Sequence, residues 1–425
     1  MRFFSKIKAQ AMQFAILISV LVALLLGAFL LLTHVHSFFR IKSKELVQAF
    51  EQSNTRIFES LNNDVVTGDT IVSVQNLGTI KEISGYHGAW LKQYTEISVH
   101  DRKVSRVAFT GVKISETTPN LYLEDANSPL VVVGSTRLEG NSYLPKLGIK
   151  AGNISGNYYQ GSALHYGRVI ESKTVLPELK PEWLTYLEGL AQGILIDTGE
   201  PIAKQKELKN SFHDPVYVIY DTNPVFLEDE KITGNIVIQS KTKIVVGPQT
   251  ELTDVVLIAP EIIIKNGVNG RFQGVATKKI KIGKRCHLSY PSAMILLDQN
   301  IAYSIPQNDQ QQNDKPDFII EEGTIIEGVV VYLNKSKDKK EKRRLKPNLK
   351  IAANVGVIGE VYCQGNIDFQ GEVQGALYSR QYITRQSGSV YLNHIYNGKI
   401  LINPVVDYAG LPFANSKNTI AKWLY

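Results

Sequence analysis

Cysteine is nearly absent from this chain: Cys286 and Cys363 are the only two in 425 residues. Small disulfide scaffolds carry many more cysteines for their length, so that class is excluded. The two residues lie far apart, each within an apolar or glycine-rich pattern typical of strands. This setting favours two buried free thiols over a disulfide bridge.

Charged residues are missing from one long stretch near the N-terminus. No Asp, Glu, Lys or Arg lies between Lys8 and Arg40, and this window contains the apolar run Ala15–Leu32. A bilayer core of about 30 Å is crossed by roughly 20 apolar helical residues, so the run is long enough to span it. It is too long for the core of a signal peptide, and no small-residue cleavage site follows it.

The flank before this run contains Arg2, Lys6 and Lys8 but no acidic residue. The positive-inside rule therefore keeps the N-terminus in the cytoplasm and sends the rest of the chain across the membrane. We expect a single-pass membrane protein, in contact with lipid, whose body is periplasmic or extracellular.

Glycine and proline are absent between Thr33 and Asn63, so neither helix breaker interrupts this stretch. Apolar residues continue beyond the membrane run at helical spacing, among them Phe50, Ile57 and Leu61. The pattern predicts one helix over residues 10–62, half in lipid and half amphipathic. The alternative is an ordinary signal anchor followed by a short amphipathic neck.

Residues 1–9 form a short basic leader that ends in a small residue, Ala9, and Gln10 opens a membrane helix that continues into an amphipathic half. In these features the start of the chain resembles the N-terminus of type IV pilins and type II secretion pseudopilins. The resemblance, which covers residues 1–62, implies cleavage after Ala9 by a prepilin peptidase, with Gln10 as the first mature residue. It also implies other pilin-like subunits as partners.

Two positions depart from the family's pattern. The leader ends in Ala9 where glycine is usual, and mature position five is Phe14, where most members carry glutamate. In the family, that glutamate pairs with a neighbouring subunit's N-terminus during filament growth. Minor pseudopilins of the K type also lack it, sit at the filament tip and carry a large soluble head. The resemblance therefore implies a subunit of that kind or a related minor pilin.

Beyond the helix the chain has a short-strand rhythm, which predicts a mainly β body. In the C-terminal half, apolar clusters recur at short intervals with glycine, asparagine or proline in most gaps. Between Gly365 and Leu377 every second residue is apolar or glycine, as in a strand buried on one side. Repeated bends without hairpin turns favour a parallel β-helix, or solenoid, over residues 231–405. A β-sandwich is the alternative.

The middle region, residues 63–230, is predicted to be a β-rich domain with one helix near residues 181–192. Trp183, Leu187 and Leu190 share one helical face there, and Pro181 stands in the first turn. Residues 406–425 are expected to form a C-terminal tail.

Signals of catalysis are scarce. The carboxylates scattered between Asp254 and Glu372 show no paired-acid signature of the kind that glycosidases use. The histidines lack metal-ligand spacing, and neither a phosphate loop nor a nucleophile elbow is present. We therefore predict no catalytic residues, no metal and no cofactor, and a structural or binding protein rather than an enzyme.

A basic run spans residues 335–346, directly after an apolar strand pattern. Its richness in lysine predicts a solvated loop that projects from the body. The alternative is a binding site for a polyanion such as teichoic acid or lipopolysaccharide. Nucleic acid is not expected, because Tyr332 is the only aromatic nearby that could stack on a base. The candidate polyanion-binding residues are Lys335, Lys337, Lys339, Lys340, Lys342, Arg343, Arg344 and Lys346.

Two functions from different classes fit these patterns. The first is a minor structural subunit of a type IV pilus or type II secretion-like filament, with an exported β-solenoid head. The second is a signal-anchored cell-envelope protein whose β-helix binds or processes polysaccharide. The start of the purified protein, at Met1 or at Gln10, distinguishes them.

The membrane helix gives a direct test. Leu21→Glu places a carboxylate near the centre of the apolar run, where charged residues cost roughly 2.5–3.5 kcal/mol on insertion scales. We expect the variant to lose stable insertion, measured as extraction from membranes by alkaline carbonate. Leu21→Ala is the matched control and should stay inserted. Carbonate-resistant Leu21→Glu protein at wild-type levels would contradict the assignment.

Overall fold

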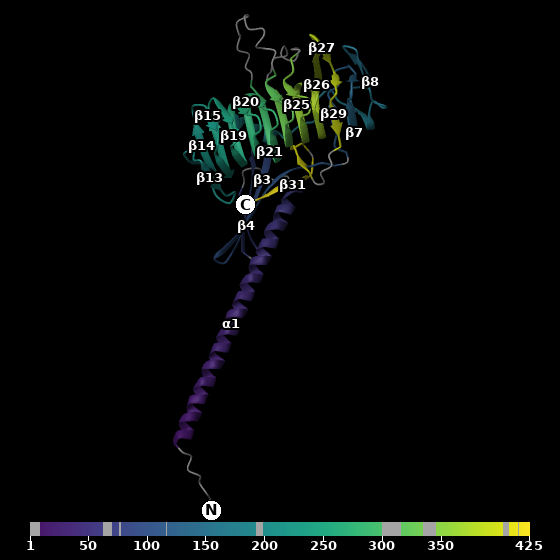
Figure 1. Cartoon of the computed structure of the whole chain (residues 1–425). Helices are drawn as coiled ribbons and strands as arrows, with labels where there is room; N and C mark the ends of the chain where they lie inside the picture. The colour runs from purple at the N-terminus through teal and green to yellow at the C-terminus, as the bar shows by residue number, and fades with distance from the viewer. Residues whose placement is uncertain are drawn as a thin grey trace, which may run out of the picture.

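The computed structural model describes residues 9–62, 70–75, 78–115, 117–192, 199–299, 316–334, 346–402, 408–414 and 416–425. Within them the chain is mainly β, with one long N-terminal helix and a barrel-like sheet of parallel strands (Figure 1). This confirms the prediction of a mainly β body behind a long helix.

Helix α1 (Ala9–Ser60) runs without a break through both predicted halves. It leaves the β-rich body at one end and extends away from it (Figure 1). The side chains of its apolar part are bare: Leu17 is 61% exposed and Leu30 is 71% exposed. The helix is long and apolar enough to cross a membrane. No other part of the described residues covers its apolar surface, which is therefore free to contact lipid or another helix.

An antiparallel sheet lies where α1 meets the body. Its strands are β1 (Thr70–Gln75), β2 (Gly78–His87), β3 (Trp90–Val99), β4 (Arg102–Lys113), β30 (Ala409–Gly410) and β31 (Asn418–Leu424). The first four follow one another as hairpins, whereas β30 and β31 come from the far end of the chain and both pair with β4. The predicted tail thus contributes two strands to the first sheet.

Parallel pairing joins most of the remaining strands, with β27 attached to β26 as an antiparallel hairpin. The strands of this sheet are β5 (Leu121–Leu123), β7 (Arg137–Leu144), β11 (Tyr166–Glu171), β12 (Glu200–Pro201), β13 (Glu207–Asn210), β14 (Tyr217–Asp221), β15 (Val225–Leu227), β16 (Lys231–Gly234), β17 (Ile236–Ser240), β18 (Lys243–Val246), β19 (Glu251–Ile264), β20 (Asn269–Ile282), β21 (His287–Asp298), β22 (Phe318–Ile320), β23 (Ile325–Asn334), β24 (Leu349–Ile351), β25 (Gly356–Phe369), β26 (Glu372–Gln386), β27 (Ser389–Leu392) and β29 (Lys399–Leu401). Smaller sheets contain β6 (Leu130–Val133), β8 (Ile149–Ala151) and β28 (His394–Tyr396), and β9 (Asn153–Ile154) with β10 (Asn157–Tyr158).

The predicted boundary at residue 230 does not coincide with a break in strand pairing. Strands β13 and β14, which precede it, pair in parallel with β16 and β17, which follow it. Strand β5 pairs with β26, and β7 pairs with β29. Residues 63–230 therefore supply four of the six strands of the antiparallel sheet, and also strands that pair in parallel with β16 and β17 and with β26 and β29. The sequence alone does not reveal these pairings, because strands that are far apart in the chain become neighbours only when the register of the sheet is set.

Apolar side chains at equivalent register positions fill the interior of the parallel sheet. In one such column each residue pairs in register with the next one on the neighbouring strand. Its members are Val225, Ile244, Ile262, Ile280, Phe318, Leu349, Ile367 and Tyr382. None of these side chains is more than 5% exposed. Full burial of such a side chain contributes about 1.5–3 kcal/mol, so this column is a major source of stability.

Cys286 and Cys363 are buried and free, as the sequence predicted. Burial raises the pKa of the Cys363 thiol to about 12 and raises the pKa of the Cys286 thiol as well. Both thiols therefore stay protonated near neutral pH and pack as small apolar groups.

Helix α2 (Pro181–Gln192) confirms the predicted helix and covers β19, β20 and β21 with its buried Trp183, Leu187 and Leu190. The turn between β2 and β3 also reaches this region. The amide of Gly88 donates to the Tyr186 hydroxyl at 3.0 Å, and the amide of Ala89 donates to Gln273 Oε1 at 2.7 Å. These bonds fix the antiparallel sheet against the parallel one.

The second half of α1 packs on β3 and β4 through Ala49, Ser53 and Ile57, which are fully buried. Next to them, the Arg106 guanidinium lies 4.8 Å from the Phe50 ring and 4.3 Å from the Trp423 ring. Its Nε also donates to Asn54 Oδ1 at 2.9 Å. One side chain of β4 thus links α1 to β31.

This contact predicts a local effect of Arg106→Ala. Loss of two cation–π contacts should weaken docking of α1 by about 1–2 kcal/mol. We expect faster amide hydrogen exchange at residues 49–57 in detergent-solubilised full-length protein, with exchange in β19–β21 unchanged. Arg102→Ala, an exposed arginine of the same strand, is the control and should leave both regions unchanged. Equal protection in the Arg106→Ala protein would show that the stack does not hold the helix.

Candidate functional site

The predicted processing residues lie at the start of α1. Ala9 and Gln10 are its first two residues, and their side chains are outside the described part of the structure. Phe14 lies on the bare apolar part of the helix and is 68% exposed. The cleavage hypothesis therefore stays a prediction, with Phe14 available to a neighbouring molecule.

Most of the predicted polyanion-binding loop lies outside the described residues. The seven basic residues from Lys335 to Arg344 belong to that part. The eighth, Lys346, is described, and its Nζ lies 2.9 Å from Asp317 Oδ2. Both side chains are mostly buried, so Lys346 serves an internal ion pair rather than an open cationic surface.

Four of the scattered carboxylates form surface ion pairs on the parallel sheet. The pairs are Lys281–Glu321, Lys284–Glu322, His287–Glu327 and Lys399–Glu372. No group of three or more His, Cys, Asp or Glu within the described ranges is arranged to hold a metal ion. These acids have the solvated or paired surroundings of structural residues.

Asp254 is a buried carboxylate with a structural role. Its oxygens accept hydrogen bonds from Arg271 at 2.8 Å, Lys422 at 2.6 Å and the Tyr425 hydroxyl at 3.2 Å. Asp254 lies in β19, whereas Lys422 and Tyr425 lie in or next to β31. Donors from the protein itself thus surround the Asp254 carboxylate, and two of them, Lys422 and Tyr425, connect the end of the chain to the parallel sheet.

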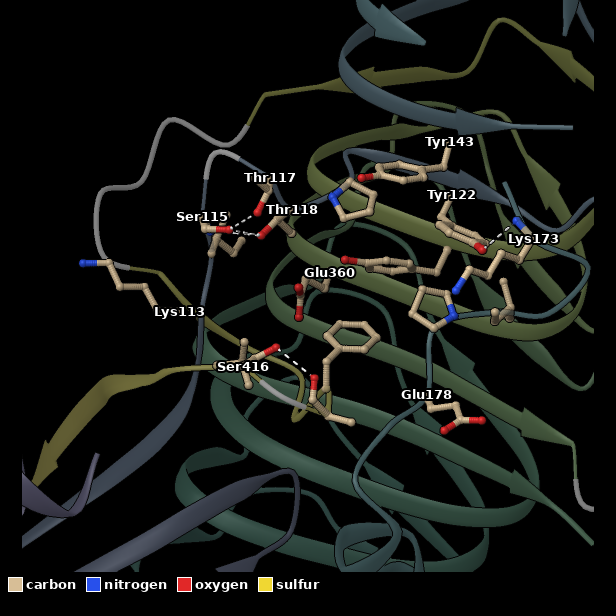
Figure 2. A pocket seen from close by; sticks show the side chains of 18 of the residues that line it. Lys113, Ser115, Thr117, Thr118, Tyr122, Tyr143, Lys173, Glu178, Glu360 and Ser416 are labelled. Atoms are coloured by element: carbon tan, nitrogen blue, oxygen red, sulfur yellow. Dashed lines mark hydrogen bonds between the residues drawn. The ribbon is translucent and has the colours of Figure 1, made fainter. Parts of the chain in front are cut away.

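The strongest candidate site is a cleft of about 930 Å³ between the two sheets. It is lined by residues that follow β4 (Ile114, Ser115 and Thr117–Pro119), by residues between β11 and α2, and by Phe413, Ala414, Ser416 and Lys417. Figure 2 shows Glu360 in the middle of the cleft, with Ser115, Thr117 and Thr118 on one side and Tyr122 and Tyr143 on another.

A row of four tyrosines crosses the parallel sheet at this cleft. Tyr362 pairs in register with Tyr378, Tyr378 with Tyr122, and Tyr122 with Tyr143. Their neighbouring ring centroids lie 5.9, 6.4 and 5.6 Å apart. Tyr378, Tyr122 and Tyr143 line the cleft, and Phe413 packs on Tyr378 with centroids 4.9 Å apart.

The same row is aliphatic elsewhere. On the neighbouring strands its positions are Ile258, Val275, Ile295 and Val331, which are buried in one cluster with residues of α2. The row changes to tyrosine at the cleft. There, the Tyr122 hydroxyl donates to the Val175 carbonyl at 3.1 Å, and the Tyr362 hydroxyl donates to the Pro177 carbonyl at 2.9 Å. The tyrosines thus also hold one wall of the cleft in place.

Glu360 is the unusual ionisable group of the cleft. It is only 2% exposed, and the Leu411 amide donates to its Oε2 at 2.5 Å. Burial raises the pKa of this carboxyl to about 7, against 4.5 for an ordinary glutamate. Within the described ranges, no lysine or arginine forms an ion pair with it to offset the burial. A Cβ atom at Gly410 would meet the Glu360 carboxyl group, so a larger residue there would require this side chain to shift.

The rim of the cleft is polar. Ser115 Oγ lies 2.9 Å from Thr117 Oγ1 and 3.2 Å from Thr118 Oγ1. Charged residues of both signs complete it: Lys113, Glu171, Lys173, Glu178 and Lys417. The cleft therefore combines an aromatic wall, a buried carboxyl and a hydroxyl rim, which can hold an uncharged polar molecule by stacking and hydrogen bonds.

Sequence reasoning placed Glu360 among scattered surface acids and overlooked the tyrosines. The one available signal was the recurrence of tyrosine near Tyr122, Tyr143, Tyr362 and Tyr378, in strand-like surroundings. It could be read only with the register known, because β5 and β7 are far from β25 and β26 in sequence.

Comparisons of this chain with protein-family models, curated proteins and solved structures found no match. The geometry of the described residues is therefore the basis for a functional assignment.

Glu360 predicts a pH dependence of stability. The unfolded chain ionises this carboxyl near pH 4.5, whereas the folded protein keeps its proton up to about pH 7. The unfolded state therefore releases the proton first, and the free energy of unfolding falls as pH rises through this window, by about 3 kcal/mol.

Glu360→Gln should remove the part of the pH dependence of the free energy of unfolding that comes from this carboxyl. Relative to wild type, the variant should gain stability between pH 5 and pH 8, measured by urea unfolding across that range. Glu207→Gln, an exposed acid on β13, is the control and should show no such gain. A constant difference between Glu360→Gln and wild type across the range would contradict the raised pKa.

Proposed function

We propose that this protein is a membrane-anchored, pilin-like minor subunit of a type IV pilus or type II secretion-like filament. The observation that carries the proposal is α1. Its first part is apolar and bare, and its second part packs on the antiparallel sheet through Ala49, Ser53 and Ile57. One rigid element thus serves both as a lipid-soluble rod and as the stem of the body.

Such a helix suits lateral packing against similar helices. In lipid, helices associate through close side-chain contact, and an uninterrupted apolar rod can exchange lipid neighbours for helix neighbours. The stacking of Arg106 between Phe50 and Trp423 keeps stem and body in a fixed relation. A displacement of α1 would therefore move the β-rich head with it, as a filament subunit requires.

We propose that the head is a parallel β-helix. In support, β19, β20, β21, β23, β25 and β26 pair in parallel, each with the next. A β-sandwich, the alternative, is normally built from antiparallel hairpins. Columns of equivalent apolar residues inside the sheet also fit stacked coils of one continuous helix.

We propose a place at the filament tip. Phe14 occupies the position where shaft subunits of the resembling family carry glutamate. An apolar residue there requires no partner in lipid, whereas an unpaired carboxylate would be costly. With the basic flank inside, the head would project from the outer side of the membrane.

A second candidate, a signal-anchored protein that binds polysaccharide without joining a filament, is favoured by the cleft beside Glu360. It shares the membrane anchor and the head but needs no cleavage after Ala9. The start of the mature protein separates the two candidates.

Two measurements in the native host test the filament proposal. N-terminal sequencing of the membrane-extracted protein should start at Gln10, and a start at Met1 would contradict the proposal. Phe14→Cys, labelled on its thiol with a photoactivated crosslinker that inserts into any neighbouring side chain, should then yield one discrete adduct with a different protein. Because Cys286 and Cys363 are buried, the wild-type protein is the control and should yield no adduct. A ladder of self-adducts would mean a shaft subunit and would overturn the tip assignment.

A further inference from the structure

The cleft between the sheets has one buried acceptor with spare capacity. The Leu411 amide uses Oε2 of Glu360, and among the described residues no donor bonds to Oε1. The Glu360 side chain is 2% exposed, and its Oε1 is not one of the fully buried polar atoms without a partner, so this oxygen keeps some access to the cleft. Glu360 lines a cleft of about 930 Å³, from which a donor can approach.

We propose that this cleft binds a short, uncharged oligosaccharide, with Glu360 accepting a hydrogen bond from a sugar hydroxyl. The inference concerns this cleft alone and holds whether or not the protein joins a filament.

The aromatic wall supplies the second requirement of such a site. Tyr143 and Phe413 keep part of their rings exposed, while Tyr122 and Tyr378 support them from beneath. A pyranose ring presents a flat face of C–H bonds that packs on an aromatic face, and its hydroxyls point outward at the edges. Tyr143 and Phe413 rest on Tyr122 and Tyr378, and the Tyr122 ring is itself held by its hydrogen bond to the Val175 carbonyl, so the aromatic wall loses little freedom on binding.

The backbone around the cleft argues against a peptide ligand. Extended peptides usually bind by adding a strand to an open sheet edge. Here β4 is flanked by β3 and by β30 and β31, and β5 is flanked by β26 and β7. Strands β25 and β26 also have partners on both sides, whereas β11, which carries the rim residue Glu171, pairs with β7 alone among the described residues. On the strands that form the wall of the cleft, recognition must therefore come from side chains.

The charges at the rim favour an uncharged ligand. Lys113, Lys173 and Lys417 are balanced by Glu171, Glu178 and the ionisable Glu360. The hydroxyls of Ser115, Thr117 and Thr118 can both donate to and accept from sugar hydroxyls. The volume lies near the top of the range of about 300–1,000 Å³ for small-molecule sites, which accommodates more than one sugar ring.

Binding is tested with the full-length chain in a detergent whose headgroup contains no sugar. The probes are cellotriose, maltotriose and chitotriose, with trigalacturonate as the acidic comparison and an alanine–serine decapeptide as the peptide comparison. We expect at least one neutral trisaccharide to bind in isothermal titration calorimetry at pH 8, with no binding of the acidic or peptide probe.

Variants locate the site. Tyr143→Ala removes a partly exposed ring and should weaken binding about five- to tenfold, with only a small fall in melting temperature from the lost stacking on Tyr122. Glu360→Gln should weaken binding about tenfold at pH 8, because a charged acceptor becomes a neutral amide. Tyr220→Ala removes a ring that is 44% exposed on β14, away from the cleft, and is the matched control with unchanged affinity.

Three results would overturn the proposal: no neutral probe binds at millimolar concentration, the peptide binds with the same sensitivity to Tyr143→Ala, or Tyr220→Ala weakens binding as much as Tyr143→Ala does. A mature protein that starts at Met1 overturns the filament proposal and leaves this one standing. The two failures are therefore distinguishable.

Discussion

The register of the parallel strands is the constraint on which the rest of the head depends. A shift of one residue would exchange the two faces of a strand and expose its interior column, the one that contains Ile262, Ile280 and Phe318. The same register fixes what lies outside the sheet. The row that contains Ile258 and Val275 is aliphatic where α2 covers it and becomes tyrosine at Tyr362, where the cleft begins. The aromatic wall of the cleft is thus a continuation of the packing pattern rather than an addition to it.

The connection between stem and head depends on two cations of different kinds. Arg106 stacks between rings of α1 and β31, while Lys422 of β31 binds the buried Asp254 of β19. Asp254 needs such partners, because an unpaired buried carboxylate would destabilise the fold by several kcal/mol, roughly 3–5 in measured cases. Strand β31 lies between these contacts, so it couples the membrane helix to the parallel sheet although it comes from the opposite end of the chain.

Local patterns in the sequence predicted α1, α2, the buried thiols and the mainly β body, because charge gaps and periodicity are local properties. The long apolar run and the spacing of Trp183, Leu187 and Leu190 need no knowledge of partners. The division at residue 230 failed because β5 and β7 pair with strands that come much later in the sequence. The cleft was out of reach for the same reason: Tyr122 meets Tyr378, and Leu411 meets Glu360, only once the sheets have formed.

Strand β31 also fixes the order in which the molecule can be completed. Strand β4 is made early, but its partners β30 and β31 follow all strands of the parallel sheet in the chain. During synthesis from the N-terminus, the edge of β4 therefore waits unpaired while the parallel sheet assembles. Trp423 can reach Arg106 only once β31 has been made, so the Arg106–Trp423 contact forms late, although α1 can already pack on β3 and β4 through Ala49, Ser53 and Ile57. A formed Arg106–Trp423 contact therefore marks a chain whose parallel strands have all been made.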